Sequence, residues 1–530
     1  FLGGRDATWL AIGASIFASN IGSEHLIGLA GAGASSGMAM AHWEIQGWMI
    51  LILGWVFVPF YTRSMVYTMP EFLERRYNPQ SRTILSVISL VSYVLTKVAV
   101  TVYAGGLVFQ QVFGIKELWG IDFFWIAAIG LVVLTALYTI FGGMKSVLYT
   151  SVLQTPILLL GSLIILVLGF KELGGWDEMM RVCGAVTVND YGDTMTNLIR
   201  SNDDANFPWL GALIGSAIIG FWYWCTDQFI VQRVLSGKNE MEARRGTIFG
   251  AYLKLLPVFL FLIPGMIAFA LHQKYIGAGG EGFLPMLANG TANADAAFPT
   301  LVAKLLPAGV KGLVVCGILA ALMSSLASLF NSSAMLFTID FYKRFRPETP
   351  EKKLVGIGQV ATVVIVILGI LWIPIMRSVG DVLYTYLQDV QSVLAPGIAA
   401  AFLLGICWKR TSAQGGMWGL IAGMVIGLTR LGAKVYYSNA GEVADSTFKY
   451  LFYDMNWLFF CGWMFLFCII VVIVVSLATK APTAEKIQGL VFGTATKEQK
   501  AATRASWNHW DIIHTVIILA ITGAFYWYFW

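Results

Sequence analysis

Polar residues interrupt an apolar run near the start of the chain. The run, Trp9 to Ala34, is long enough to cross a bilayer as a helix, and Gly22 and Gly28 each weaken helical structure by about 1 kcal/mol relative to alanine. A carboxylate or an imidazole at the centre of a membrane is costly and is usually functional. The polar residues are Ser19, Asn20, Ser23, Glu24 and His25.

This close grouping predicts a discontinuous helix. An unwound segment at membrane depth is tolerated only where it lines a cavity enclosed by protein, and its free carbonyl groups can then bind a cation. The alternative is a continuous helix whose polar side chains pack against neighbouring helices. We favour the discontinuous helix because so many polar residues fall within two turns.

The apolar segment 208–233 shows the same kind of interruption. Gly220 is followed by a polar and aromatic cluster. Two interrupted helices in corresponding positions of two halves are the sequence signature of an inverted-repeat transporter. With an odd number of spans per half, the second half is inverted across the membrane and the two interruptions meet at its centre. The cluster comprises Trp222, Tyr223, Trp224, Thr226, Asp227 and Gln228.

A patch of small polar residues lies in the apolar segment 320–333. Hydroxyl and carbonyl oxygens are the ligands that sodium takes in such transporters. Ser324 and Ser325, with the carbonyl group of Ala321, could therefore face the interruption between Ala18 and Ile21. Close helix packing through small residues explains the same pattern equally well.

Isolated polar residues in other apolar segments suit a neutral polyol, which needs hydrogen-bond partners and aromatic faces. Lys254 could equally extend to the membrane surface, Trp43 and Tyr384 could be interfacial anchors, and Lys97 is expected to be structural. The candidate hydrogen-bonding residues are His25, Glu44, Lys254 and Gln388. The candidate aromatic residues are Trp43, Tyr223, Trp224 and Tyr384.

The composition is that of a polytopic membrane protein. Of 530 residues, 57% are hydrophobic and 12% are charged, whereas soluble domains have about 25% charged residues. Basic residues gather in every second loop, which places these loops in the cytoplasm. About thirteen spans are expected, at 6–33, 39–61, 83–113, 121–141, 147–170, 208–233, 247–272, 297–342, 354–376, 381–407, 414–434, 455–478 and 510–529.

Other function classes have little support in the sequence. The net charge of +5 comes from loop residues and does not indicate nucleic-acid binding. The six cysteines lack metal-binding spacing, and there is no phosphate-binding loop or nucleophile elbow. We therefore expect no enzyme activity and no cofactor, with sodium as the coupling ion. The expected partners are a small-molecule sugar, sodium and the lipid bilayer, with no obligate protein partner.

Several stretches closely resemble the sodium/glucose cotransporter branch of the solute:sodium symporter family. They are spread from near residue 1 to about 430, so chance agreement is improbable, and the C-terminal segments add little. The resembling stretches are 18–28, Thr68–Phe72, Trp222–Gln228 with Gln232 and Arg233, Tyr252–Lys254, Ala321–Ala327 and Trp408–Arg410.

The resemblance implies an all-α membrane protein with the LeuT-type inverted repeat of five plus five helices and about three C-terminal helices. The transport core would be 1–410, with repeat one at about 6–170 and repeat two at about 208–407, followed by additional helices in 411–530. We expect a multi-pass protein of the plasma membrane.

The resemblance also implies positions for the two sites and the gates. Tyr223 would close the sugar site on its cytoplasmic side, and Leu29, Trp43 and Tyr384 would form the outer gate. The sugar site would comprise Asn20, His25, Glu44, Tyr223, Trp224, Lys254 and Gln388. The sodium site would comprise Ala18, Ile21, Ala321, Ser324 and Ser325.

Some positions depart from the pattern of the family. Gly220 stands where relatives often have Asn or Thr, and Gly47 where one has Ser, which leaves the preferred hexose open. Ser151 stands where the family usually has Asp, and Ala327 replaces the hydroxyl residue of members that use two sodium ions. We expect alternating-access symport of one sodium ion with a glucose- or galactose-like hexose. Myo-inositol or another polyol is the alternative, and a sodium channel or a sensor is a more distant one.

Overall fold

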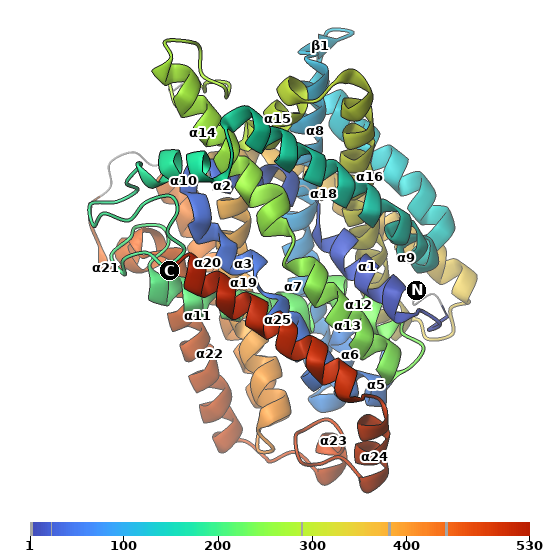
Figure 1. Cartoon of the computed structure of the whole chain (residues 1–530). Helices are drawn as coiled ribbons and strands as arrows, with labels where there is room; N and C mark the ends of the chain where they lie inside the picture. The colour runs from blue at the N-terminus through green and yellow to red at the C-terminus, as the bar shows by residue number, and fades with distance from the viewer. Residues whose placement is uncertain (1–3, 23, 288–289, 380–382, 440–443) are drawn as a thin grey trace.

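Helices account for almost all of the computed structural model, which describes residues 4–22, 24–287, 290–379, 383–439 and 444–530. Among these residues, eleven helical stretches are long and apolar enough to span a membrane, and two shorter apolar helices, Trp9–Asn20 and Phe123–Leu137, accompany them. Together they overlap all thirteen predicted spans. The helices form a bundle, and short as well as long connections join them (Figure 1).

The first predicted half contains two helices of interest here, one broken and one unusually long. Helix α6 (Met69–Arg76) begins after Thr68, whose side-chain oxygen accepts the free backbone N–H group of Glu71. Helix α7 (Pro79–Ser92) begins in the same way after Asn78, which accepts the backbone N–H group of Ser81. The elements are α1 (Trp9–Asn20), η1 (Glu24–Leu29), α2 (Ala30–Ser36), η2 (Gly37–Met40), α3 (Ala41–Glu44), α4 (Gly47–Ile52), η3 (Leu53–Phe57), α5 (Val58–Ser64), α6 (Met69–Arg76), α7 (Pro79–Ser92), η4 (Tyr93–Val98), α8 (Ala99–Phe113), β1 (Glu117–Leu118), β2 (Ile121–Asp122) and α9 (Phe123–Leu173).

Helix α9 differs from the prediction. Two helices, 121–141 and 147–170, are expected on either side of a loop, but the backbone is helical throughout the 51 residues from Phe123 to Leu173. Figure 1 shows two arms of this helix that run in different directions. The side chains of 138, 140–148, 150, 151, 153 and 154, including that of Ser151, lie outside the described residues. The only strands in the described chain, β1 and β2, pair just before this helix.

The second predicted half repeats the broken helix. Its elements are α11 (Trp209–Gly220), η5 (Phe221–Thr226), α12 (Gln228–Leu235), α13 (Glu240–Lys254), η6 (Val258–Leu262), α14 (Ile263–Gly277), η7 (Ala294–Ala296), α15 (Ala297–Leu305), α16 (Ala308–Met335), η8 (Leu336–Tyr342), α17 (Lys343–Phe345), α18 (Glu351–Val379) and α19 (Leu383–Cys407). The short α10 (Trp176–Gly184) lies between the halves.

An extended residue lies at the interruption of each broken helix. Ile21 follows α1 with ψ 95°, and Asp227 separates η5 from α12 with ψ 129°. Asp227 also begins the new helix, because its side chain accepts the backbone N–H of Phe229. Helix α19 packs against both η1 and η5, so the two interruptions share one neighbour. The predicted discontinuity of both helices is thus present in the backbone.

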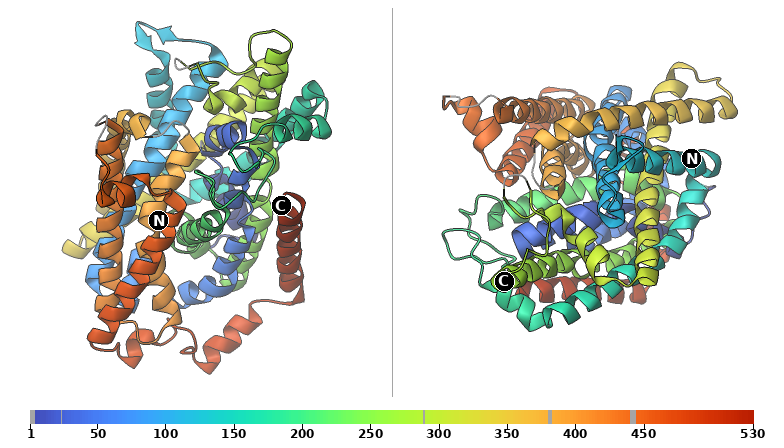
Figure 2. Two further views of the ribbon diagram at one scale, coloured as in Figure 1. Left: turned by 90° about the vertical axis from the view of Figure 1, so that its left-hand side faces the viewer. Right: turned by 90° about the horizontal axis from the view of Figure 1, so that it is seen from above.

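The C-terminal helices cover two sides of this core. Helix α25 lies on the outside of the bundle along α4 and α13 (Figure 2). The indole of Trp55 donates to the Thr515 hydroxyl over 2.9 Å, and Arg245 pairs with Asp511 at 3.1 Å. The elements are α20 (Ala413–Asn439), α21 (Thr447–Lys449), η9 (Tyr450–Asp454), α22 (Trp457–Ala478), α23 (Ala484–Ile487), α24 (Lys497–Ala505) and α25 (His509–Tyr528).

Candidate functional site

A small polar cavity lies between the two interruptions. Its volume is about 40 Å³, which is enough for a few water molecules but far below the roughly 300 Å³ at the lower end for ligand pockets. The cavity is small because polar side chains reach across it and bond to one another. It is lined by Asn20, Glu24, His25, Trp43, Gln46, Lys97, Ile219, Gly220, Tyr223, Trp224, Lys254, Tyr384, Leu387, Gln388 and Gln391.

The carboxylate of Glu44 is the centre of the hydrogen-bond network. Its Oε2 atom accepts from Lys254 Nζ at 2.6 Å and lies 3.1 Å from His25 Nε2. Its Oε1 atom accepts from the Tyr384 hydroxyl at 2.6 Å. Glu44 ends the short helix α3, His25 lies in η1, and Lys254 ends α13. Four segments that are remote in sequence therefore meet at one buried carboxylate.

A second part of the network runs from Lys254 to Tyr223. Lys254 Nζ donates to Asn20 Oδ1 over 3.2 Å, and Asn20 Nδ2 donates to the Tyr223 hydroxyl over 3.1 Å. Lys254 Nζ also lies 5.3 Å from the centre of the Trp224 ring, within the range of a cation–π contact. Lys254 is 3% exposed, so it does not extend to the membrane surface.

Lys97 lies directly against the tyrosine at this end of the cavity. Its Nζ atom is 4.3 Å from the centre of the Tyr223 ring and 4.1 Å from that of Phe229. Lys97 belongs to the π-helical segment η4, a type of distortion that is frequent at functional sites. From the sequence Lys97 is expected to be structural, but in the structure Lys97 also lines the cavity.

Gln46 fills the space that Gly220 leaves open. A Cβ atom at Gly220 would overlap the side-chain amide of Gln46, and Gln46 Nε2 donates to the carbonyl of Ser216 over 2.8 Å. Gln46 is not among the site residues predicted from the sequence. The polar residues at every second position of this apolar segment, His42, Glu44 and Gln46, are a signal that could have identified it. The helix interruption between α3 and α4 directs this side chain inward.

Several polar atoms of the cavity have no hydrogen-bond partner among the described residues. They are His25 Nδ1, Trp43 Nε1 and Gln388 Oε1. A buried polar atom without a partner costs about 1–3 kcal/mol, so each is a position where a bound hydroxyl group would be stabilising. His25, Trp43 and Gln388 are all predicted site or gate residues.

The predicted outer gate occupies one side of the cavity. Trp43 stacks on Trp457 of α22 with 5.5 Å between ring centres, and Tyr384 packs so closely on Gly28 that a Cβ there would lie 2.9 Å from that of the tyrosine. Leu29 is fully buried at the end of η1. Trp43 and Tyr384 line the cavity, whereas Leu29 does not.

A buried carboxyl group lies next to this gate. Asp295 accepts the backbone N–H of Leu383, the first residue of α19, over 3.2 Å. Its other oxygen has no hydrogen-bond partner among the described residues and lies against Gly31. Because burial disfavours the charged form, the pKa of Asp295 is raised to about 7.

The predicted sodium residues lie where α1 and α16 cross. Ser325 Oγ donates to the carbonyl of Ser19 over 3.0 Å, and Ser328 Oγ lies 2.9 Å from Ser19 Oγ. A Cβ at Gly22 would overlap Ser325 Oγ, so only glycine allows this approach. Ala18, Ile21, Ala321 and Ser324 are buried on the same two segments. Thus the hydroxyl patch faces the interruption instead of serving helix packing alone.

The family model of the sodium:solute symporters matches residues 1–423. The chain belongs to this family. Its relatives include human sodium/myo-inositol cotransporter 2, which is 37% identical over 93% of this chain and 74% of the relative. Sheep sodium/glucose cotransporter 1 is 39% identical over 91% of this chain and 74% of the relative. As a member of a family of symporters, the chain is a transporter and not an enzyme.

Solved structures confirm the fold class. A sodium-coupled sialic acid symporter in its substrate-bound outward-open state aligns with a TM-score of 0.69 at 22% identity, over 91% of this chain and 92% of its own. A nucleobase-cation-symport-1 transporter aligns with a TM-score of 0.51 at 14% identity, over 92% and 96%. This symporter is therefore a multi-pass membrane protein with the LeuT fold, consistent with the plasma membrane.

Proposed function

We propose that this symporter couples sodium entry to the uptake of a neutral hexose of the glucose or galactose type. The charge balance of the cavity supports a neutral solute most directly. Its lining contains one carboxylate, Glu24, and two ammonium groups, Lys97 and Lys254, but no arginine. The carboxylate of Glu44, behind the lining, accepts from Lys254 Nζ at 2.6 Å and balances the second ammonium group. An anionic substrate would need an excess of positive charge, which these four groups together lack.

The chemistry of the lining suits a sugar. A hexose presents hydroxyl groups that both donate and accept, and His25, Lys254 and Gln388 of the lining provide matching groups. Glu44, which is bonded to Lys254 and Tyr384 of the lining, would provide a further acceptor. The aromatic rings of Tyr223 and Trp224 would pack on its C–H surface. Since the cavity is small, sugar would have to replace bonds that the residues make with each other.

For sodium, the proposed ligands are the carbonyls of Ala18, Ile21 and Ala321 and the hydroxyls of Ser324 and Ser325. One sodium ion per sugar follows from Ala327, which is buried and has no hydroxyl group. At about 100 mV one sodium ion gains roughly 2.3 kcal/mol, and a tenfold gradient adds about 1.4 kcal/mol. These would support roughly 500-fold accumulation of sugar. A reversal potential indicating two sodium ions per sugar would contradict the proposed stoichiometry.

The proposed transport cycle is alternating access. Sodium binding at the interruption of α1 would favour the conformation that admits sugar from outside. Sugar would then be enclosed by Leu29, Trp43 and Tyr384, and rocking of the two repeats would open the side closed by Tyr223. A ligand can shift this equilibrium only by its difference in affinity between the two conformations.

Myo-inositol is the second candidate substrate, because human sodium/myo-inositol cotransporter 2 is 37% identical. Both candidates are neutral polyols, so charge cannot separate them. A comparison of uptake can separate them. Uptake of labelled galactose, glucose and myo-inositol into proteoliposomes is measured under an inward sodium gradient, with potassium in place of sodium as the control. Sodium-dependent accumulation of a hexose, lost in Lys254→Ala, supports the proposal. Accumulation of myo-inositol alone would overturn the hexose assignment, and current that neither saturates nor depends on solute would indicate a channel.

A further inference from the structure

A second and much larger cavity lies at the end of the molecule where α16 and α18 are joined. Its volume is about 700 Å³. By the positive-charge pattern of the loops, this end is the cytoplasmic one. The polar substrate cavity is elsewhere and shares no lining residue with it. The lining comprises Tyr67, Glu71, Arg82, Thr139, Phe330, Asn331, Ala334, Ile339, Lys343, Arg344, Pro347, Glu351, Leu354, Val355, Gly358, Gln359 and Thr362.

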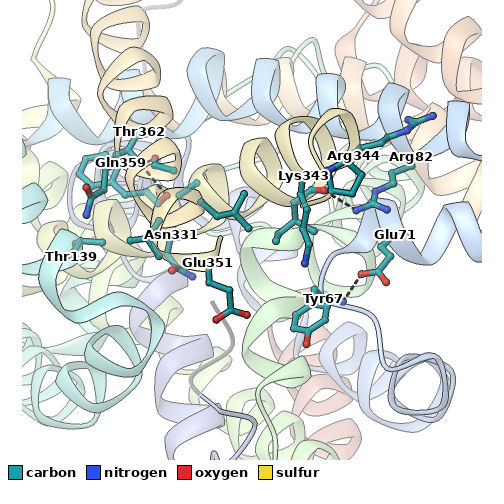
Figure 3. A pocket seen from close by; sticks show the side chains of 17 residues that line it. Tyr67, Glu71, Arg82, Thr139, Asn331, Lys343, Arg344, Glu351, Gln359 and Thr362 are labelled. Atoms are coloured by element: carbon teal, nitrogen blue, oxygen red, sulfur yellow. Dashed lines mark hydrogen bonds between the residues drawn. The ribbon is translucent and has the colours of Figure 1, made fainter. Parts of the chain in front are cut away.

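The basic and the uncharged polar residues of this cavity lie on different sides. Figure 3 shows Arg82, Lys343 and Arg344 together on one side and Asn331 and Thr362 on the other, with the acidic Glu351 close to Asn331. The cavity also has an apolar wall, which is formed by Phe330, Ala334, Leu354 and Val355.

The direction from the basic side to the apolar wall matches the direction of a lipid in the membrane. Phe330 precedes Lys343 by roughly 20 Å of helix, and Thr362 follows Glu351 by roughly 16 Å, at about 1.5 Å per residue. Helix α16 leaves the membrane toward Lys343, and α18 enters it from Glu351. The basic side therefore lies at headgroup level and the apolar wall extends toward the membrane interior. Val355 in this wall is 48% exposed, so the wall reaches the outer surface of the helix bundle.

Two of the three cations on the basic side lack an acidic partner in the described chain. Arg82 is neutralised by Glu74 at 2.6 Å and Asp340 at 2.7 Å. Arg344, in contrast, bonds within the described residues to the Pro79 carbonyl and the Thr83 hydroxyl, neither of which is acidic. Lys343 is exposed and has no hydrogen-bond or ion-pair partner in the described part of the chain.

The acids of the lining do not pair with these two cations in the described part of the chain. Glu71 already pairs with Arg75 at 3.1 Å and accepts the backbone N–H of Tyr67 at 2.8 Å. Glu351 and the second of the two acids at Arg82 balance the total charge, so the positive charge is a local feature of Lys343 and Arg344, which form no ion pair with these acids among the described residues. Basic pockets between transmembrane helices on the cytoplasmic side are suited to anionic lipid headgroups, since this leaflet carries the anionic lipids.

From this complementarity of charge, depth and shape, we propose that the cavity binds one anionic phospholipid of the cytoplasmic leaflet. The phosphate lies between Lys343 and Arg344, and one acyl chain follows Phe330, Ala334 and Val355. The site is independent of the proposed sugar and sodium sites, so its test does not depend on the transported solute.

The test is lipid-dependent thermal stability of the purified full chain in detergent. Phosphatidylglycerol and phosphatidylcholine of the same chain length are titrated separately, and the unfolding midpoint is followed by tryptophan fluorescence. We expect phosphatidylglycerol to raise the midpoint at lower concentration than phosphatidylcholine. Because each basic residue near an anionic headgroup contributes roughly a fivefold gain in affinity, Lys343→Gln combined with Arg344→Gln weakens the phosphatidylglycerol response roughly 30-fold.

A matched control is available in the same loop. Lys352→Gln combined with Lys353→Gln removes the same charge from exposed residues that do not line the cavity, and the phosphatidylglycerol response should persist. Three outcomes would each overturn the proposal. The two lipids could raise the unfolding midpoint equally, or the two double variants could lose the phosphatidylglycerol response equally. Free glycerol phosphate could also raise the midpoint as much as phosphatidylglycerol does. Both variants must unfold at the wild-type midpoint without lipid. If the Lys343 and Arg344 variant does not, single substitutions at Lys343, which has no protein partner to lose, replace it.

Discussion

The hydroxyl group of Tyr384 donates to the carboxylate of Glu44 over 2.6 Å. Tyr384 belongs to the proposed outer gate and Glu44 to the proposed sugar site. In the proposed mechanism, closure on one side of the cavity and substrate recognition within it would therefore use the same carboxylate. A hydroxyl group of sugar that bonds to Glu44 would compete with Tyr384 or share its acceptor, which couples binding to the position of α19.

Tyr384→Phe tests this coupling. A hydrogen bond to a charged group contributes about 1.5–3 kcal/mol, so its loss should change the substrate KM by about 10- to 100-fold while the ring still fills its space. Initial uptake rates against substrate concentration measure the change. Tyr386→Phe is the control, because Tyr386 lies on the same helix but donates to the Leu95 carbonyl at 3.1 Å, outside the cavity. Equal effects in the two variants would contradict a special role for Tyr384.

Removal of Lys254 should damage both stability and transport. Breaking a buried ion pair by removing one partner costs about 3–5 kcal/mol, because the other charge stays buried. Lys254→Met should lower the unfolding midpoint, and addition of Glu44→Gln should restore much of the stability without restoring uptake. The comparison uses thermal unfolding and sodium-driven uptake on the same preparations. Full uptake by the double variant would exclude this pair from substrate binding.

Ser325→Ala should act on sodium rather than on sugar. The substitution removes one proposed oxygen ligand, and also the bond to the Ser19 carbonyl at 3.0 Å. We expect the sodium concentration for half-maximal uptake to rise more than tenfold, with nearly normal sugar affinity at saturating sodium. Ser333→Ala is the control, since this buried serine on α16 has no hydrogen-bond partner in the described chain. An unchanged sodium dependence in Ser325→Ala would argue against the proposed ion site.

Gly220→Ala should disturb the sugar cavity through Gln46. The added methyl group would overlap the Gln46 amide and displace it from the Ser216 carbonyl. We expect a several-fold increase in substrate KM with an unchanged sodium dependence, measured by uptake at fixed and varied sodium. Gly130→Ala is the matched control, because no atom lies within 4 Å of a Cβ at that position. A normal KM in Gly220→Ala would show that Gln46 can move without cost.

Asp295 should make stability depend on pH. Its pKa is raised from 3.8 to about 7 by burial, so the folded protein holds this proton more tightly than the unfolded chain does. The resulting stability is fully present below about pH 4 and is lost as the pH rises to 7. At about 1.4 kcal/mol for each pKa unit, the effect is at most about 4 kcal/mol.

Asp295→Asn should therefore flatten the pH profile between pH 4 and 7 and be more stable than wild type at pH 8. Unfolding midpoints at several pH values provide the measurement. The control is Glu178→Gln, since Glu178 is paired with Arg181 on the surface helix α10. A profile for Asp295→Asn that parallels the wild type would rule out Asp295 as the titrating group.

The parts of the fold that could be predicted from the sequence are those in which one segment shows the signal by itself. The interruptions at Ile21 and Asp227 follow from polar residues and glycines in apolar runs, and the structure has both. The continuity of α9 could not be predicted in this way, because a short polar stretch between apolar runs is compatible with either a loop or a helix. The backbone there is helical.

In the candidate site, too, some features could be predicted from a single segment and others could not. Glu44 and Lys254 are both predicted as hydrogen-bonding residues of the substrate site, because isolated charges in apolar helices stand out, but their pairing with each other at 2.6 Å is not predicted. Lys97 gave the same signal, but its partners are the rings of Tyr223 and Phe229, which do not stand out as partners of a cation. Gln46 acquires its position from a helix interruption and from the missing side chain at Gly220, a relationship between segments that no single stretch contains.

The attachment of α25 also has a consequence for biosynthesis. Its partners are Trp55, in the first predicted half of the transport core, and Arg245, in the second, at 2.9 Å and 3.1 Å. During translation α25 leaves the ribosome only after both of these segments. Complete docking of α25 therefore requires that the two segments have already met, and a chain in which Arg245 was out of place would leave Asp511 without this partner.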